Sequence, residues 1–150
     1  MREILFRGKT KTGKWVEGTV AYLKAVDHPK QKVYTIIIPI SGDCNWFNGY
    51  IFDKYQVIPE TLGQYTGIKD VFGRKIYEGD IVEVTCKFKG KVEFENCGVV
   101  KYILNGFQVE TFTEDEDFTF PLYDCQNNDE RGDTFIVIGN IYDDSELLED

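Results

Sequence analysis

The sequence is poor in the residues that most often carry catalysis and metal binding. It has a single histidine, His28, which stands beside Pro29 in a polar segment. Its four cysteines form no CxxC pair, so the spacing typical of tetrahedral zinc sites is missing. Schemes in which histidine activates a nucleophile or acts as a general base lack their central group. We therefore expect no metal, no cofactor and no catalytic residue.

Long apolar segments are missing as well. The longest apolar run, residues 34–40, is far too short to cross a bilayer and contains Pro39. The opening residues lack the apolar core of a secretory signal, so we expect no membrane partner and a cytoplasmic location. In that reducing compartment the scattered cysteines are expected to be free thiols. These cysteines are Cys44, Cys86, Cys97 and Cys125.

Alanine is nearly absent, whereas Val, Ile, Tyr, Phe and Thr are frequent. Ala21 and Ala25 are the only alanines. This bias disfavours long helices and favours half-buried strands. With 42% hydrophobic and 29% charged residues, the chain of 150 residues is expected to be globular and large enough to bury a core. The composition therefore predicts an all-β protein with one or two short helices.

Strand and turn patterns divide the chain. Residues 3–8 and 15–22 are predicted to be two strands joined by a turn in which Gly13 has a positive φ. Residues 34–40 suit a strand that is covered on both faces. Asn48-Gly49 and Asn105-Gly106 are each typical of a two-residue hairpin turn.

Short strands with frequent turns indicate a sandwich or a partly open barrel. We expect one unit over residues 1–150, made of two β lobes at 1–55 and 56–150. An alternating strand at 81–88 begins the barrel-like part of the C-terminal lobe, which we predict to be a partly open SH3-like barrel or a sandwich.

Glycines and acids crowd residues 60–84, and turn chemistry explains them. Residues 59–62 predict one helical turn ended by a left-handed Gly63, 70–73 predict a type I turn, and 78–80 predict a second turn. Most of the glycines in this stretch are therefore expected at positive φ. They are Gly63, Gly67, Gly73 and Gly79. Tyr65 and Tyr77 are expected to be at least half buried.

Two pairs of carboxylates, Glu78/Asp80 and Asp143/Asp144, admit two interpretations. Neighbouring carboxylates suit acid–base chemistry or Mg²⁺ binding. Asp and Glu are also ordinary residues of turns and helix caps, and we favour that structural interpretation.

Residues 13–20, GKWVEGTV, are echoed at 73–82 by GRKIYEGDIV. Both segments suit the strand that returns from a turn. The echo is explained either by a duplicated unit or by two hairpins that arose independently.

Four separated motifs resemble the YopX family of bacteriophage and prophage proteins. They are MREILFRGK, GKWVEG, GQYTGIKDVFGRKIYEGDIV and VIGNIYDDSELL. The resemblance implies a mostly β fold and a phage or prophage origin, and it implies no activity. Val71 and Phe72 stand where the family usually has a polar pair, which suggests that Phe72 packs against another group.

The N-terminal part of the chain is basic. Residues 1–40 contain eight Lys or Arg and three acids, a net charge of +5. Lys9, Lys11 and Lys14 surround a turn next to Trp15, and basic residues beside an aromatic suit a nucleic-acid-binding module. The net charge of −9 for the whole chain opposes phosphate binding.

An aromatic cluster suggests a different class of function. Trp46, Phe47 and Tyr50 lie close together in the sequence, and such clusters are enriched at protein interfaces as well as in small cores. We therefore expect a non-enzymatic protein-interaction or self-assembling module that binds itself or a host or phage protein. A nucleic-acid-binding module is the alternative, and an enzyme with carboxylate chemistry comes third.

Negative charge is concentrated at the other end of the chain. Residues 110–150 contain fourteen acids and one basic residue, Arg131, a net charge of −13. Such blocks are usually solvated loops. Our hypothesis is that they bind the basic N-terminal hairpin of a neighbouring copy or a basic host protein.

Overall fold

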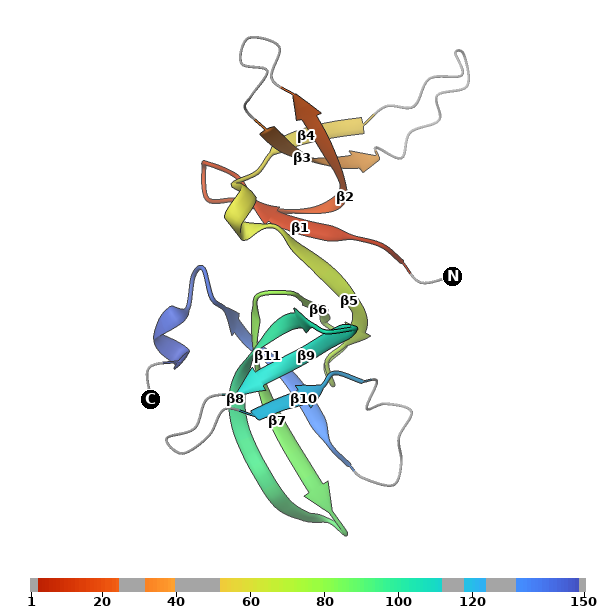
Figure 1. Cartoon of the computed structure of the whole chain (residues 1–150), viewed down its shortest axis with the longest axis vertical. Helices are drawn as coiled ribbons and strands as arrows, with labels where there is room; N and C mark the ends of the chain where they lie inside the picture. The colour runs from red at the N-terminus through yellow and green to blue at the C-terminus, as the bar shows by residue number, and fades with distance from the viewer. Residues whose placement is uncertain (1–2, 25–31, 40–51, 112–117, 124–131, 149–150) are drawn as a thin grey trace. The chain divides into compact units, whose positions relative to one another are not determined.

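The computed structural model describes residues 3–24, 32–39, 52–111, 118–123 and 132–148. The chain divides into two compact units, Met1–Gln64 (unit 1) and Tyr65–Asp150 (unit 2), whereas the sequence suggested a division after residue 55. The fold is all-β, as predicted: the strands pair in antiparallel fashion, and among the residues just given only short 3₁₀ helices accompany them (Figure 1). No helix in the described ranges is long and apolar enough to span a membrane.

Unit 1 is a twisted sheet in which β2 pairs with both β1 and β3, and β3 pairs with β4. The start of β5 adds to the other side of β1 through Arg7 and Gly63. The elements are β1 (Phe6–Lys9), β2 (Trp15–Lys24), β3 (Lys32–Pro39), β4 (Phe52–Gln56), the 3₁₀ helix η1 (Pro59–Thr61) and the beginning of β5 (Gly63–Lys69).

A small core holds unit 1 together. Val16, Ile36 and Val57 are buried, with Tyr34 and Tyr55 packed against them. The predicted strand at 34–40 is therefore covered at its centre, although Tyr34 and Ile38 are only half-buried. Trp46, Phe47, Tyr50 and the Asn48-Gly49 turn lie outside the described residues.

Thr61 fastens η1 to β1. Its hydroxyl oxygen accepts the backbone N–H of Lys9 at 2.8 Å and its hydroxyl donates to the carbonyl of Ile58 at 2.7 Å. The N–H of Ile58 in turn donates to the carbonyl of Lys9 at 2.8 Å. This side chain therefore satisfies two backbone groups at the end of β1.

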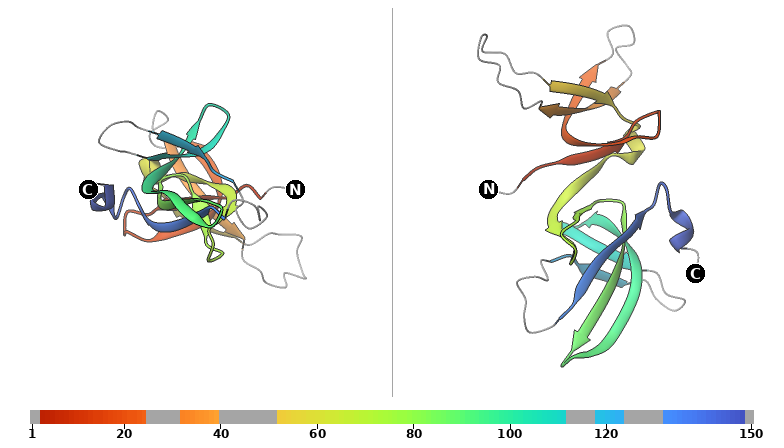
Figure 2. Two further views of the ribbon diagram at one scale, coloured as in Figure 1. Left: turned by 90° about the horizontal axis from the view of Figure 1, so that it is seen from below. Right: turned by 180° about the vertical axis from the view of Figure 1, so that it is seen from behind.

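Unit 2 contains a five-stranded sheet in the order β10-β9-β8-β7-β11 and a short hairpin formed by β5 and β6. Figure 2 shows β7 and β8 as a long twisted hairpin. The strands are β6 (Lys75–Tyr77), β7 (Asp80–Phe88), β8 (Lys91–Ile103), β9 (Gly106–Thr111), β10 (Phe118–Pro121) and β11 (Thr134–Asn140), followed by the 3₁₀ helix η3 (Ser145–Leu148).

The core of unit 2 is built from inward side chains of this sheet together with Ile76 of β6 and Leu122, which follows β10. The buried residues are Ile76, Val82, Val84, Val100, Val109, Leu122 and Phe135. The alternating pattern predicted for residues 81–88 therefore places Val82 and Val84 inside. A β-bulge at Glu93 of β8 lies between the Cys86–Phe94 and Lys87–Val92 pairs, and Phe88 at the end of β7 is 61% exposed.

The turn glycines largely follow the prediction. Gly73 and Gly79 have φ angles of 81° and 84° in turns, and Gly67 has 88° where the pairing of β5 with β6 is irregular. Gly63 is different: it is a residue of β5 paired with Arg7, because Leu62 ends η1 in an extended conformation. Tyr65 and Tyr77, by contrast, are buried as predicted and stack with their ring centroids 5.5 Å apart; they are 5% and 4% exposed.

The hairpin predicted at Asn105-Gly106 is present, but its turn lies one residue earlier. Ile103 pairs with Gly106, so Leu104 and Asn105 are the two turn residues. Leu104 has a φ of 55° and is 86% exposed. The sequence also missed the hairpin between β7 and β8, whose turn residues Lys89 and Gly90 both have positive φ.

The echo in the sequence corresponds to two loops of the same geometry. In unit 1 the N–H of Thr10 donates to the carbonyl of Lys14, and in unit 2 the N–H of Asp70 donates to the carbonyl of Arg74, both at 2.8 Å. Gly13 and Gly73 each donate to the first carbonyl of their loop at 2.9 Å. Both units therefore contain this type of hairpin loop, with Thr10 at its first position in unit 1 and Asp70 in unit 2.

The sequence suggested that Phe72 packs against another group, but most of its ring is exposed to solvent. Phe72 is 72% exposed, because the third position of this loop points to solvent. The Arg74 guanidinium lies over one face of the ring at 5.5 Å.

Candidate functional site

The clearest concentration of interaction chemistry in unit 1 lies around the hairpin loop between β1 and β2. We call it the basic hairpin surface and define it by six residues. They are Arg7, Lys9, Lys11, Lys14, Trp15 and Tyr55.

The strand register places one aromatic ring among the cations of β1. Lys9 pairs directly with Trp15 across the ladder, and Arg7 lies two residues away on the same face. The Arg7 guanidinium carbon is 5.0 Å from the centroid of the Trp15 ring, and the Lys9 ammonium is 6.0 Å from it. A half-buried indole therefore carries two positive groups within the usual range of a cation–π contact.

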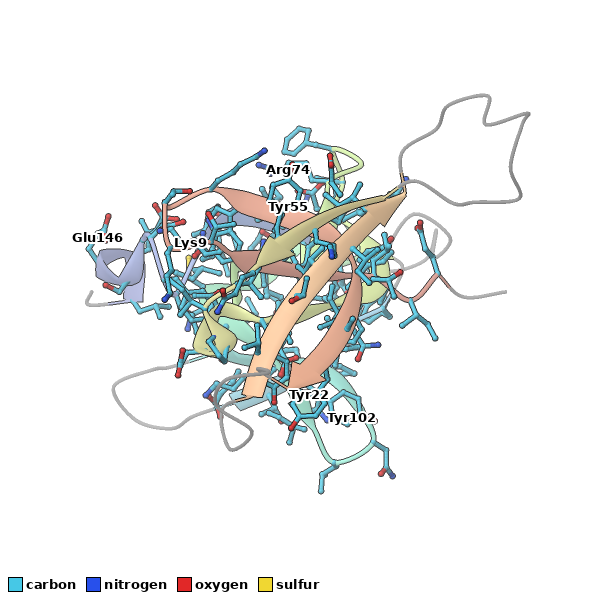
Figure 3. All side chains as sticks on the ribbon, turned by 90° about the horizontal axis from the view of Figure 1, so that it is seen from above. Lys9, Tyr22, Tyr55, Arg74, Tyr102 and Glu146 are labelled. Carbon is cyan, nitrogen blue, oxygen red and sulfur yellow. The ribbon has the colours of Figure 1, made fainter. Side chains whose placement is uncertain are left out.

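A second cation–aromatic pair joins the loop to β4. The Lys14 ammonium lies 5.0 Å from the centroid of the Tyr55 ring. Figure 3 labels Lys9 on β1 and Tyr55 on β4. Tyr55 also packs against the core of unit 1, so its ring is a fixed platform for the lysine.

The loop itself is rigidly built. The hydroxyl of Thr10 accepts the N–H of Lys14 at 3.1 Å and shares a hydrogen bond of 2.9 Å with the hydroxyl of Thr12. Gly13 takes a φ of 84°, as the sequence predicted. The tight loop leaves Lys11 and Lys14 exposed on either side of Gly13.

The sequence identified Lys9, Lys11 and Lys14 and named Trp15 as their neighbour. It missed Arg7 and Tyr55. The two-residue period of β1 was the available signal for Arg7, whereas Tyr55 reaches the surface through the tertiary pairing of β3 with β4. The structure does not describe Trp46, Phe47 and Tyr50, the other predicted partner-binding residues.

Two of the four carboxylates that offered an alternative site, Asp80 and Asp144, accept backbone N–H groups. One oxygen of Asp80, which is only 1% exposed, accepts the N–H of Tyr77 at 2.7 Å. One oxygen of Asp144 accepts the N–H of Asn140 at 3.0 Å. Both carboxylates therefore shape turns. Among the described residues, no group of three or more His, Cys, Asp or Glu is placed to hold a metal ion.

Asp70, which is also only 1% exposed, uses its carboxylate in the same way. It accepts the backbone N–H groups of Phe72 and Arg74 at 2.9 Å each and the Arg74 Nε–H at 2.7 Å. Burial by itself raises the pKa of Asp70, but these bonds and one from Val137 outweigh it, so the pKa lies below its ordinary value.

Comparison with known proteins supports one family and one fold. A family model described as YopX protein matches residues 5–149. The crystal structure of protein EF1440 from Enterococcus faecalis has 21% sequence identity and a TM-score of 0.50, and the match covers 99% of each chain. A search of curated proteins finds no match. At this identity the structural likeness concerns the fold alone.

Proposed function

The chain belongs to the YopX family, and we propose that it is a non-enzymatic interaction module that associates with further copies of itself. In this proposal, the basic hairpin surface of one copy binds the acidic residues of another. One observation carries the proposal: around a rigid hairpin loop of unit 1, Arg7 lies over the ring of Trp15 and Lys14 lies over the ring of Tyr55.

The distribution of charge along the chain provides acidic residues that complement the basic hairpin surface. The net charge is +5 over residues 1–40 and −13 over residues 110–150. Asp143 and Glu146 are exposed near η3, so part of this negative charge is available to a neighbour. Exposed ion pairs contribute only about 0–1 kcal/mol each, so several must form together and salt must weaken the contact.

The assignment as a non-enzyme is also part of the proposal. The observed roles of Asp70, Asp80 and Asp144 support it, because each of these carboxylates accepts backbone N–H groups. A carboxylate held in this way orders a turn and is poorly placed to transfer a proton to a substrate.

Sedimentation velocity over roughly 50 to 500 mM salt tests the self-association, since screening changes strongly over that range. We expect the wild type to associate at low salt and to dissociate at high salt. Changing Lys9, Lys11 and Lys14 to Ala is expected to abolish association. As a matched control, three exposed lysines of unit 2 are changed to Ala, which we expect to leave association intact. These lysines are Lys69, Lys89 and Lys91.

Two results would contradict the proposal. One is a monomer at every salt concentration. The other is an oligomer that responds neither to salt nor to the loss of the three hairpin lysines.

Single-stranded nucleic acid is the second candidate partner, and Trp15 between Arg7 and Lys9 favours it. A base stacks on such a ring while the cations contact phosphates. Fluorescence titration with a labelled single-stranded oligonucleotide tests this binding. Trp15→Leu is expected to weaken it and Lys11→Ala to reduce its salt dependence. If the fluorescence of the oligonucleotide does not change with protein concentration at low salt, single-stranded nucleic acid is excluded as a partner. Self-association then remains the proposed function.

The cellular setting completes the proposal. The family resemblance supports an accessory protein of a bacteriophage or prophage that acts in the cytoplasm of the bacterial host. Besides itself, its proposed partner is a host or phage protein. Cys86 and Cys97 are free thiols in the described part of the chain, which agrees with a reducing compartment.

A further inference from the structure

A cavity of about 450 Å³ opens in unit 2, whereas the basic hairpin surface belongs to unit 1. It lies where the end of β7 and the start of β8 meet β10 and the beginning of β11. Its volume is within the range of pockets that bind small molecules or single side chains.

Four aromatic rings form much of the cavity wall. They are Phe88, Phe120, Tyr123 and Phe135. Tyr123 meets Phe135 edge to face, with centroids 5.5 Å apart and planes at 86°. Phe120 is held in turn by Phe94, at a centroid distance of 4.8 Å. Three of the four rings are thus positioned by packing, and the fourth, Phe88, is 61% exposed at the rim.

A carboxylate is fixed among these rings. Asp133 is 8% exposed, one of its oxygens accepts the N–H of Lys87 at 2.8 Å, and the other accepts the hydroxyl of Tyr123. Both donors are neutral, so they orient the carboxylate without cancelling its charge. Within the described residues, the Lys87 ammonium forms no ion pair with Asp133 or Glu93, although all three side chains line the cavity.

We propose that this cavity binds an organic cation, such as an alkylated ammonium group. A cation inside it faces aromatic rings, whose π faces attract positive charge, and the oriented carboxylate of Asp133. Two carboxylates and one lysine line the cavity, so its charge balance also favours a cation over an anion. A neutral apolar ligand displaces water from Asp133 without offering a partner, which costs free energy.

Choline and its neutral isostere 3,3-dimethylbutan-1-ol, which have nearly the same shape, provide the test. The measurement is an NMR titration that follows the backbone amides of Lys87 and Phe135. We expect saturable shifts with choline and binding at least about tenfold weaker with the isostere, a difference of about 1.4 kcal/mol. Asp133→Asn is expected to weaken choline binding by a similar factor.

Controls separate binding from folding. Glu146→Gln removes an exposed carboxylate of the same unit outside the cavity lining and is expected to leave choline binding unchanged. If Asp133→Asn fails to fold, Phe88→Ala replaces it, because this ring is mostly exposed, with Val92→Ala on the same hairpin as its matched control. Phe88→Ala is expected to weaken choline binding and Val92→Ala to leave it unchanged.

The inference is overturned if choline and its isostere bind equally well, or if choline causes no saturable shift at up to about 10 mM. Choline binding that survives both Asp133→Asn and Phe88→Ala also overturns it. The variant that lacks Lys9, Lys11 and Lys14 is expected to bind choline normally. The result of the choline test therefore does not depend on whether the protein self-associates.

Discussion

Asp70 and Val137 are 67 residues apart in the sequence, yet a carboxylate oxygen of Asp70 accepts the backbone N–H of Val137 at 3.2 Å. The N–H of Val71 donates to the carbonyl of Phe135 at 3.3 Å in the same contact. The loop between β5 and β6 therefore satisfies backbone groups on the outer edge of β11. Covering an edge in this way prevents it from pairing with another chain.

Asp70→Asn is expected to destabilise unit 2 by about 1–3 kcal/mol at about pH 7, because an amide nitrogen then faces backbone N–H groups or Arg74 in place of an acceptor oxygen. The folded-state pKa of Asp70 lies below its ordinary value of 3.8, so its contribution is present above that value and is lost as the pH falls through the folded pKa. Urea denaturation at about pH 7 and about pH 3 measures both effects. A stability difference that does not shrink on acidification would contradict the assignment.

Thr61→Val is expected to destabilise unit 1 by about 1–2 kcal/mol, because the shape is kept while the hydrogen bonds to Lys9 and Ile58 are lost. Urea denaturation followed by tryptophan fluorescence reports on unit 1, since both tryptophans lie in residues 1–64. Thr19→Val, at an exposed position of β2, is the control and is expected to change little. Equal effects of the two substitutions would show that the Thr61 hydroxyl contributes nothing.

Gly98→Ala is expected to destabilise unit 2 by about 1–3 kcal/mol through overpacking. A Cβ at Gly98 would lie 2.6 Å from the carbonyl oxygen of Glu110 and 2.7 Å from a methyl group of Val109. Gly106→Ala, in the neighbouring strand, meets nothing within 4 Å and is expected to stay within about 0.5 kcal/mol of the wild type. Thermal or urea unfolding of the two variants provides the comparison, and a reversed order would show that β8 and β9 are less closely packed here.

Cys97 is expected to react slowly with alkylating reagents. Burial raises the pKa of its thiol, and the carboxylates of Glu83 and Glu95 raise it further. Glu95→Gln is expected to lower that pKa and to speed labelling of Cys97 at about pH 8, measured by mass spectrometry of the labelled peptide. Glu93→Gln, on the same strand, is the control. Equal labelling rates in the two variants would remove Glu95 as a cause.

Local chemistry was enough to predict several parts of the fold. The alternation of Val82 and Val84, the positive φ of Gly13 and Gly73, and the burial of Tyr65 follow from strand periodicity and turn preferences. These features depend on neighbours within a few residues, so the sequence carries them directly. The same holds for the three lysines of the hairpin, which cluster in the sequence itself.

Turn positions were less predictable where pairing with a distant strand competes with turn preference. Gly63 is the first residue of β5 rather than a turn residue, because it pairs with Arg7 of β1. The turn between β8 and β9 falls on Leu104 and Asn105, because the register of the two strands outweighs the preference of Asn105-Gly106. Register is set by many side chains at once, and no single dipeptide decides it.

Only the tertiary structure brought the residues of the two proposed sites together. Composition already separated a basic N-terminal part from an acidic C-terminal part, because charge is a property of the residues alone. The placement of Tyr55 beside Lys14, and of Asp133 among the rings of Tyr123 and Phe135, depends on contacts between strands. Burial and long-range pairing decide such contacts, and the sequence contains them only through the fold.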